Sequence, residues 1–277
     1  MNKLKRFIKA NPIPTIGICI ILFFVAVAVF APFIAPFDPH ERVGKPYQLP
    51  CDEFILGTND IGQDIFSEMI YGTRVSLSIG IIAALATMII GTFLGIVSGF
   101  FGGITDKIVL AVISTIMCLP SLPLTLVLVT ILGSGYVNLV IMLCLTSWAG
   151  TAKVIRSTIF SMKKQAYIMI APSLGIPTRH TIIKYIVPNL KEILITRFAL
   201  SVGSAIIVES SLSFLGIHVG FAKSWGNVLH HAYSGSGIIN NYYWWYAPPI
   251  ICISLCMIGF MLFAQLNSKR FGVANGG

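Results

Sequence analysis

The strongest constraint in this sequence is the length of the stretches that contain no Asp, Glu, Lys or Arg. The three longest cover residues 10–37, 75–105 and 108–152, which are 28, 31 and 45 residues long. A helix crosses roughly 30 Å of hydrocarbon with about 20 apolar residues, at about 1.5 Å per residue. Only 10% of the residues are charged and 56% are hydrophobic, whereas a soluble domain is about a quarter charged. These runs exclude an ordinary soluble globular protein and predict a membrane protein.

Six transmembrane helices in an all-α polytopic fold are expected. The 45-residue run is too long for one span, and the Gly-Ser-Gly turn at 133–135 divides it in two. The run at 10–37 is longer than the apolar part of a cleaved signal peptide, so it is interpreted as a retained anchor. The expected spans lie within 10–37, 75–105, 108–132, about 137–148 and slightly beyond, 193–215 and 245–266.

The basic residues predict how the chain is oriented. With the N-terminus inside, the cytoplasmic segments hold 15 Lys and Arg residues and the outer segments hold four. Lys and Arg resist translocation and collect in cytoplasmic segments, so we expect both termini in the cytoplasm of the cell, in a multi-pass protein of the cell membrane. The net charge of +9 then reflects topology, and no nucleic-acid partner is expected.

Several chemical signatures are missing from the sequence. There is no G-x-x-x-x-G-K-[ST] phosphate loop, no H-E-x-x-H metal motif and no G-x-S-x-G nucleophile motif. We therefore predict no catalytic residue, no metal site and no cofactor bound by this chain. Cys252 and Cys256 are interpreted as packing residues, and Gly235 and Gly237 as part of a flexible Ser-Gly linker.

A glycine pattern predicts a helix contact, and an aromatic cluster predicts a membrane interface. Gly91, Gly95 and Gly99 form a repeated G-x-x-x-G, which places three positions without a side chain on one helix face and lets a second helix approach closely. The aromatic cluster at 242–246 is predicted to form an interfacial belt.

The segment 153–190 is the one large cytoplasmic loop that the sequence predicts. Its first half is basic, and an apolar stretch at 168–174 is followed by the helix-stopping Gly175 and by Pro177. A second amphipathic stretch at 181–187 is expected to end at Pro188. A cytoplasmic loop does not lie in the membrane, and a loop exposed only to water would not need apolar residues. The segment is therefore predicted to be the contact surface for a soluble protein.

These residues carry a family resemblance. Ala171, Gly175 and the Pro188 of IVPN at 186–189 are spaced as in the EAA loop of ABC importer permeases. Five further segments occur in the same order as in one branch of that group, the second permease of peptide and nickel importers: FILGTNDIGQDIFS at 54–67, YGTRVSLS at 71–78, LPSLP at 119–123, GSAIIVESSLSFLG at 203–216 and SWG at 224–226. The resemblance covers nearly the whole chain.

The resemblance implies a type I ABC importer permease, which moves peptides, nickel or metal chelates delivered by an extracytoplasmic binding protein. It implies an anchor and outer segment at 1–77, a permease core at 78–268 that includes the coupling loop 153–190, and a short tail at 269–277. It also implies a sister permease in a heterodimer, surrounding lipid, and two cytosolic ATPases that bind ATP and Mg²⁺. The outer segments 38–74 and 224–243 would receive the binding protein.

The resemblance also implies site residues. The coupling loop would contact the ATPase through Ala166, Tyr167, Ala171, Leu174, Gly175, Pro177, Thr178 and Pro188. The loop departs from the family pattern at Met169, where a glutamate is usual, so an acidic contact is absent at that position.

An intramembrane acid is by default a functional hypothesis, and Glu209, with Ser210 and Ser213, is expected to line the translocation path. The alternative for Glu209 is a carboxyl group that is hydrogen-bonded to neighbouring helices. For the whole chain, the alternative function is an ATP-independent channel or ion-coupled carrier.

Overall fold

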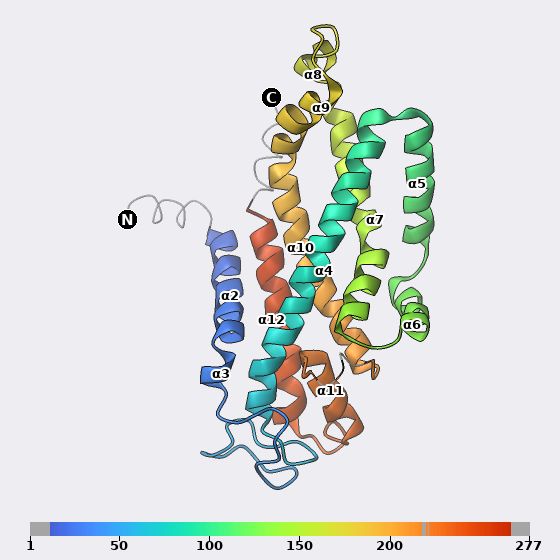
Figure 1. Cartoon of the computed structure of the whole chain (residues 1–277). Coiled ribbons are helices and arrows are strands. Elements are labelled where there is room, and N and C mark those ends of the chain that lie inside the picture. The colour runs from blue at the N-terminus through green and yellow to red at the C-terminus, as the bar shows by residue number, and fades with distance from the viewer. Residues whose placement is uncertain (1–11, 218–219, 221, 267–277) are drawn as a thin grey trace, which may run out of the picture.

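The computed structural model describes residues 12–217, 220 and 222–266. The basic residues Lys3, Lys5, Arg6, Lys9, Lys269 and Arg270 and the expected tail 269–277 lie outside them. Figure 1 shows an elongated bundle whose helices run between two ends. The helices are α2 (Pro12–Val29), α3 (Ala31–Ile34), α4 (Ile65–Phe101), α5 (Gly103–Cys118), α6 (Ser121–Leu132), α7 (Tyr136–Met162), α8 (Ala166–Ile170), α9 (Thr178–Thr181), the π-helical turn η1 (Ile182–Ile186), α10 (Val187–Phe214), α11 (Trp225–Ser234) and α12 (Tyr243–Ala264).

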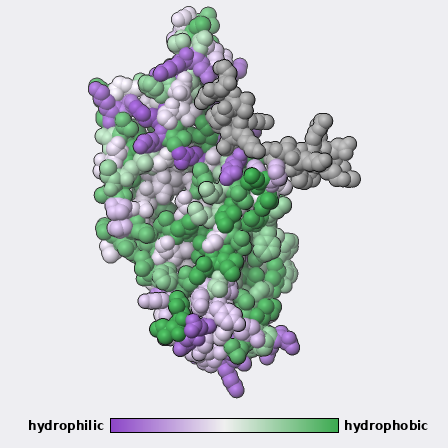
Figure 2. Space-filling model, turned by 180° about the vertical axis from the view of Figure 1, so that it is seen from behind, coloured by the Kyte–Doolittle hydropathy of each residue, from purple (hydrophilic) through white to green (hydrophobic). Residues whose placement is uncertain are grey.

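Five of these helices, or six spans when a bent pair is counted as one, are long and apolar enough to cross a membrane. Figure 2 shows hydrophobic residues over the middle of one face and hydrophilic residues gathered toward both ends. Within the described residues the only β pairing is one antiparallel bridge, Thr58 to Asp64. The all-α polytopic prediction is confirmed.

The bundle has two ends of different character. At one end α8 and α9 project beyond the other helices, and at the opposite end lie the outer segment 35–64 and α11 (Figure 1). We call these the elbow end and the entry end. The helix α4 reaches the entry end because it begins ten residues before the expected span, at Ile65. The Asp64 carboxylate caps it by accepting hydrogen bonds from Ser67 N at 2.8 Å and Ser67 Oγ at 2.6 Å.

The expectation of one straight helix over 108–132 is wrong. The chain forms α5 and α6, whose axes differ by 94° at a short break. Leu119, which precedes Pro120, is extended, with φ −82° and ψ 132°. A residue before proline is driven out of the helical region, and proline itself has no N–H to continue the ladder. The apolar composition predicted the span, while the proline determines its bend.

The expected helix end at Pro188 is also wrong. Helix continues from Thr178 through Phe214, and Pro188 occupies one of the first two positions of α10. The wider π-helical turn Ile182–Ile186 immediately precedes it. The wider π-helical hydrogen-bond pattern there accommodates the missing proline N–H. As a result, α9, η1 and α10 form one continuous helix.

Glycines allow close contacts between helices. A Cβ on Gly95 would lie 2.8 Å from Ile155 Cβ of α7, and Gly91 and Gly99 meet the same helix at Thr151 and Arg156. On the other side of the bundle a Cβ on Gly17 would lie 2.6 Å from Gly259 O, which brings α2 against α12. The G-x-x-x-G face of α4 therefore packs on α7.

The helix α11 was not expected from the sequence, and near it the structure differs from two predictions, the interfacial belt and the flexible linker. Trp225 and Trp245 are both fully buried, so Trp245 does not belong to an interfacial belt. The expected flexible linker is instead an ordered turn, in which Gly237 N donates to Ala232 O at 2.8 Å and Gly235 lies against the Trp245 ring. The two indoles pack α11 and this turn onto the bundle.

Candidate coupling, entry and translocation sites

The elbow consists of α8, the turn at 171–177 and α9. Gly175 has φ +71°, a backbone conformation that glycine adopts without strain, and Ile176 N reaches back to Ala171 O at 3.1 Å. Pro177 is extended and immediately precedes α9. Glycine and proline therefore produce the helix, turn and short helix that the sequence predicts for this segment.

The elbow presents apolar side chains to its surroundings. Leu174 is 71% exposed and Tyr167 46%, and Ala166, Gly175, Pro177, Thr178 and Pro188 are exposed as well. Ala171 is buried, so it lies on the inner side of the turn. Of the eight residues predicted for coupling, seven are accessible to a partner in this structure.

The elbow is firmly attached to the bundle. Ile168 of α8 packs in one cluster with Ile155, Ile159 and Met162 of α7, Ile186 of η1 and Leu190 of α10. Lys163 Nζ donates to Phe100 O at 2.6 Å, which joins the end of α7 to the end of α4. A displacement of the elbow would therefore be transmitted directly to α7 and α10.

A second polar contact braces the same end. Arg156 of α7 holds Asp106 of α5 through two hydrogen bonds, Nε to Oδ1 at 2.5 Å and Nη2 to Oδ2 at 2.6 Å. Ser98 Oγ of α4 also donates to Asp106 Oδ1. A bidentate Arg–carboxylate pair fixes geometry as well as charge, so α4, α5 and α7 are joined at this point.

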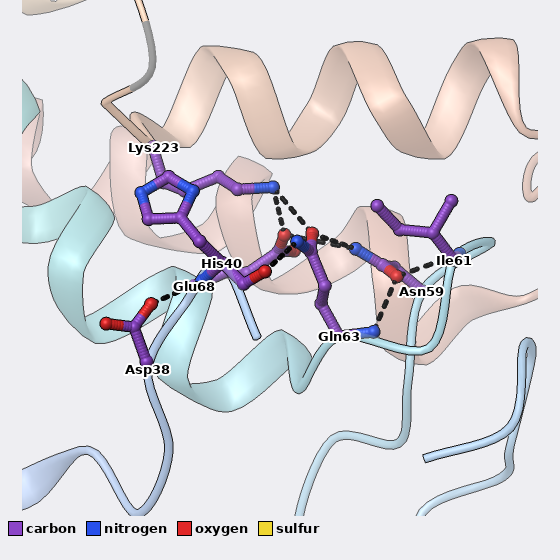
Figure 3. A network of polar contacts seen from close by, with 7 residues as sticks. All are labelled: Asp38, His40, Asn59, Ile61, Gln63, Glu68 and Lys223. Atoms are coloured by element: carbon purple, nitrogen blue, oxygen red, sulfur yellow. Dashed lines mark hydrogen bonds and ion pairs between the residues drawn. The ribbon is translucent and has the colours of Figure 1, made fainter. Parts of the chain in front are cut away.

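At the entry end, a buried polar network joins the outer segment to Lys223, two residues before α11 (Figure 3). Lys223 Nζ lies 2.6 Å from Glu68 Oε1 and 2.8 Å from Gln63 Oε1. Asn59 Nδ2 donates to the same two oxygens at 3.1 and 3.0 Å, and Gln63 Nε2 donates to His40 O at 2.9 Å. The network thus holds the outer segment onto the start of α4.

The electrostatics of the network depend on Lys223. Glu68 is fully buried at the start of α4 and Lys223 is 8% exposed. Removing either charge would leave the other buried without a counter-charge, which destabilises a protein strongly. Burial raises the pKa of the adjacent Asp60 carboxyl, and Lys223 partly offsets this rise. No sequence pattern indicated this network, because its ion pair joins residues 155 positions apart.

Replacing Lys223 with methionine is expected to destabilise the purified protein by about 3–5 kcal/mol, because it leaves the Glu68 carboxylate buried without its cation. The measurement is thermal unfolding in detergent. The matched control is the double variant Lys223→Met with Glu68→Gln, which removes both charges and should recover more than half of the loss. Equal stability of the single variant and the unaltered protein would contradict the assignment.

Glu209, Ser210 and Ser213 lie together inside the protein near the end of α10. Glu209 is fully buried, and Ser213 Oγ donates to its Oε1 at 2.9 Å while Ser76 Oγ of α4 donates to its Oε2 at 3.2 Å. Ser210 Oγ lies 3.3 Å from the same Oε2. The structure therefore places Glu209 among hydrogen-bonding hydroxyls of α4 and α10, which corresponds to the structural alternative. Its role in translocation stays a prediction.

A polar cavity of about 190 Å³ lies elsewhere, between α4, α7 and α10. It is lined by Arg197 and by hydroxyl groups, and neither Glu209 nor its serines line it. A sequence signal for it exists, since Arg197, Ser201 and Ser204 are spaced by four and three residues and so share one face of a helix. Among the described residues, no cluster of His, Cys, Asp or Glu could hold a metal ion.

Comparison with known proteins agrees with this architecture. The family described as "binding-protein-dependent transport system inner membrane component" matches residues 91–273. The family described as "N-terminal TM domain of oligopeptide transport permease C" matches residues 4–50.

Three curated proteins show how far the similarity extends. The oligopeptide transport system permease protein OppC of Bacillus subtilis (strain 168) is 32% identical over 257 residues, which are 91% of this chain and 82% of that protein. The dipeptide transport system permease protein DppC of the same strain is 33% identical, over 92% of this chain and 80% of its own. The glutathione transport system permease protein GsiD of Pectobacterium atrosepticum is 30% identical, over 83% and 77%. The chain thus belongs to the family of binding-protein-dependent ABC transport permeases, which are multi-pass proteins of the inner membrane.

Proposed function

We propose that this chain is one permease of an ATP-driven importer of peptides. A sister permease completes the pore, two cytosolic ATPases supply the energy, and an extracytoplasmic binding protein delivers the peptide. The relatives named above are permeases of oligopeptide, dipeptide and glutathione transport systems, which favours peptides over nickel or metal chelates as the solute. The chain itself carries out no hydrolysis in this proposal.

The proposal rests on how the elbow is exposed on one side and packed against the bundle on the other. An exposed apolar surface projects from the bundle on α8 and the turn at 171–177, and Ile168 on its buried side packs with residues of α7 and α10. ATP-driven closure of the ATPases would push on this surface, and the packed helices would transmit the push as a rigid-body movement. A channel or an ion-coupled carrier has no need for such a surface.

The orientation belongs to the same proposal. Among the described residues, Lys163 and Lys164 shortly precede the elbow and Arg179 lies in it, whereas seven of the ten acidic residues lie between Asp38 and Glu68 at the entry end. The excess of basic residues at the elbow end supports a cytoplasmic elbow. The outer segment would then face the binding protein.

The experiment is uptake into liposomes that contain the complete complex, with binding protein and a radiolabelled dipeptide outside and ATP inside. Uptake is expected with ATP and should fall to background when the ATPases carry a substitution that prevents hydrolysis. A parallel assay with nickel in place of the dipeptide tests the other solute class. Dipeptide uptake by the isolated chain without ATP would overturn the proposal in favour of a channel or carrier.

A further inference from the structure

The cavity between α4, α7 and α10 is lined on all three helices by hydroxyl groups. Thr87 lies on α4, Ser147 and Thr151 on α7, and Ser201 and Ser204 on α10. Thr196 of α10 lies 3.4 Å from Ala264 O, the end of α12, so the cavity begins at that level and extends along α10 from Arg197 to Ala205. The lining residues lie near the middle of α4, α7 and α10, so the cavity occupies the middle of the bundle.

Arg197 is the one charged residue in this lining, and it is half-buried. Two other basic residues, nearer the elbow end, have partners: Arg156 binds Asp106, and Lys163 binds Phe100 O. In the described part of the chain Arg197 has neither a hydrogen bond nor an ion pair. A guanidinium cannot be deprotonated in a protein, and a charge at membrane depth faces a partner or a water-filled cavity. The cavity thus presents a permanent positive charge.

The two sides of α10 differ at this level. Phe198 and Ala199 face a separate groove of about 310 Å³, which they share with apolar residues of α2, α4 and α12. Arg197, Ser201 and Ser204 line the polar cavity instead. Lipid chains suit the apolar groove, whereas the cavity offers hydrogen-bond donors on three helices. This separation favours a polar solute over lipid as the occupant of the cavity.

The size and chemistry of the cavity indicate which part of a solute fits. A cavity of about 190 Å³ has room for the end of a peptide. The planar guanidinium forms two parallel hydrogen bonds with a carboxylate, and the serine hydroxyls add further donors. We propose that this cavity is a binding site for the C-terminal carboxylate of a peptide during its passage, with Arg197 as the anion ligand and Ser201 and Ser204 as supporting donors. The inference rests on the proposed peptide transport.

The first test uses the complete complex and one tripeptide, supplied with a free C-terminal carboxylate or as its C-terminal amide. Arg197→Gln should lower uptake of the free acid at least tenfold and uptake of the amide less than twofold. Arg197→Lys retains the charge and should lower uptake of the acid only about threefold. Lys191→Gln removes an exposed charge from the same helix outside the cavity and should change neither. An equal effect of Arg197→Gln on acid and amide would overturn the inference.

The second test needs no transport. In complexes whose native cysteines are replaced by serine, Ser201→Cys is labelled with an anionic or a cationic methanethiosulfonate of similar size. The anionic reagent should react at least fivefold faster, and Arg197→Gln should abolish this preference. The free-acid tripeptide at millimolar concentration should slow labelling, and its amide should not.

The two tests separate the possible failures. A reagent preference that does not depend on Arg197 overturns the anion site, as does equal protection by acid and amide. Slowing by vesicles rich in anionic lipid, with no effect of peptide, assigns the site to a lipid headgroup and also overturns the proposal. If the unaltered complex imports no peptide, the proposed function fails, while the labelling preference still decides whether Arg197 forms an anion site.

Discussion

Replacing Gly175 with valine is expected to lower ATP-driven uptake at least tenfold while the amount of protein in the membrane stays unchanged. Gly175 has φ +71°, and a Cβ there would meet nothing within 4 Å. The substitution therefore introduces no clash, but a side chain in this left-handed conformation costs roughly 1–2 kcal/mol. The turn relaxes to another conformation, and Leu174, which is 71% exposed, no longer points where an ATPase would meet it.

The matched control is Gly133→Val. Gly133 has φ +78° and ψ 170° and a similarly open surrounding, with a single atom at 3.9 Å. A side chain there is strained as well, in a conformation essentially restricted to glycine, but in the turn between α6 and α7, away from the elbow. It should retain uptake within about twofold of the unaltered complex. Both variants are measured as uptake per amount of complex in vesicles. Equal losses in the two variants would show that strain alone, and not the elbow, lowers transport.

The second large effect is expected at the contact of α4 with α7. A Cβ on Gly95 would lie 2.8 Å from Ile155 Cβ and 2.9 Å from Ala152 O. Gly95→Ala should therefore destabilise the protein by about 1–3 kcal/mol through overpacking. Gly95→Leu should reduce the yield of folded, assembled complex more than tenfold.

Gly203→Ala provides the comparison within the same bundle. Gly203 is also a buried helical glycine, but its nearest neighbour would be Met257 Cγ at 3.6 Å, an ordinary contact. Alanine should be neutral or stabilising there, by up to about 1 kcal/mol, because it favours helix over glycine. Thermal unfolding in detergent and gel-filtration yield measure both sites. A Gly95→Ala protein as stable as Gly203→Ala would contradict the packing described here.

The sequence predicted the spans well because membrane insertion is governed by composition over about 20 residues. Gly175 and Pro177 predicted the elbow because their backbone preferences act locally. The charge-free run at 108–132 concealed its bend, although LPSLP at 119–123 contains two prolines. The continuation of helix through Pro188 depends on a π-helical turn, a rare feature that propensity rules do not anticipate.

The missed features depend on contacts between distant segments. The helix α11 has ten residues and is held by burial of Trp225, whose indole Nε1 donates to Met69 O at 3.3 Å. The Lys223–Glu68 pair and the cavity at Arg197 likewise bring together residues that are far apart in the sequence. Neither hydrophobic periodicity nor turn signals report which helices meet, so these sites required the structure.

If the force for transport enters through the elbow, the elbow must contact an ATPase subunit. The most direct measurement joins Leu174→Cys to single cysteines on the surface of the ATPase subunit in the complete complex, and follows dipeptide uptake in the same vesicles. A disulfide is expected between Leu174→Cys and the ATPase, with uptake blocked while the disulfide is closed and restored by reductant. ATP-driven uptake that continues in a complex whose elbow reaches no ATPase cysteine would contradict the account.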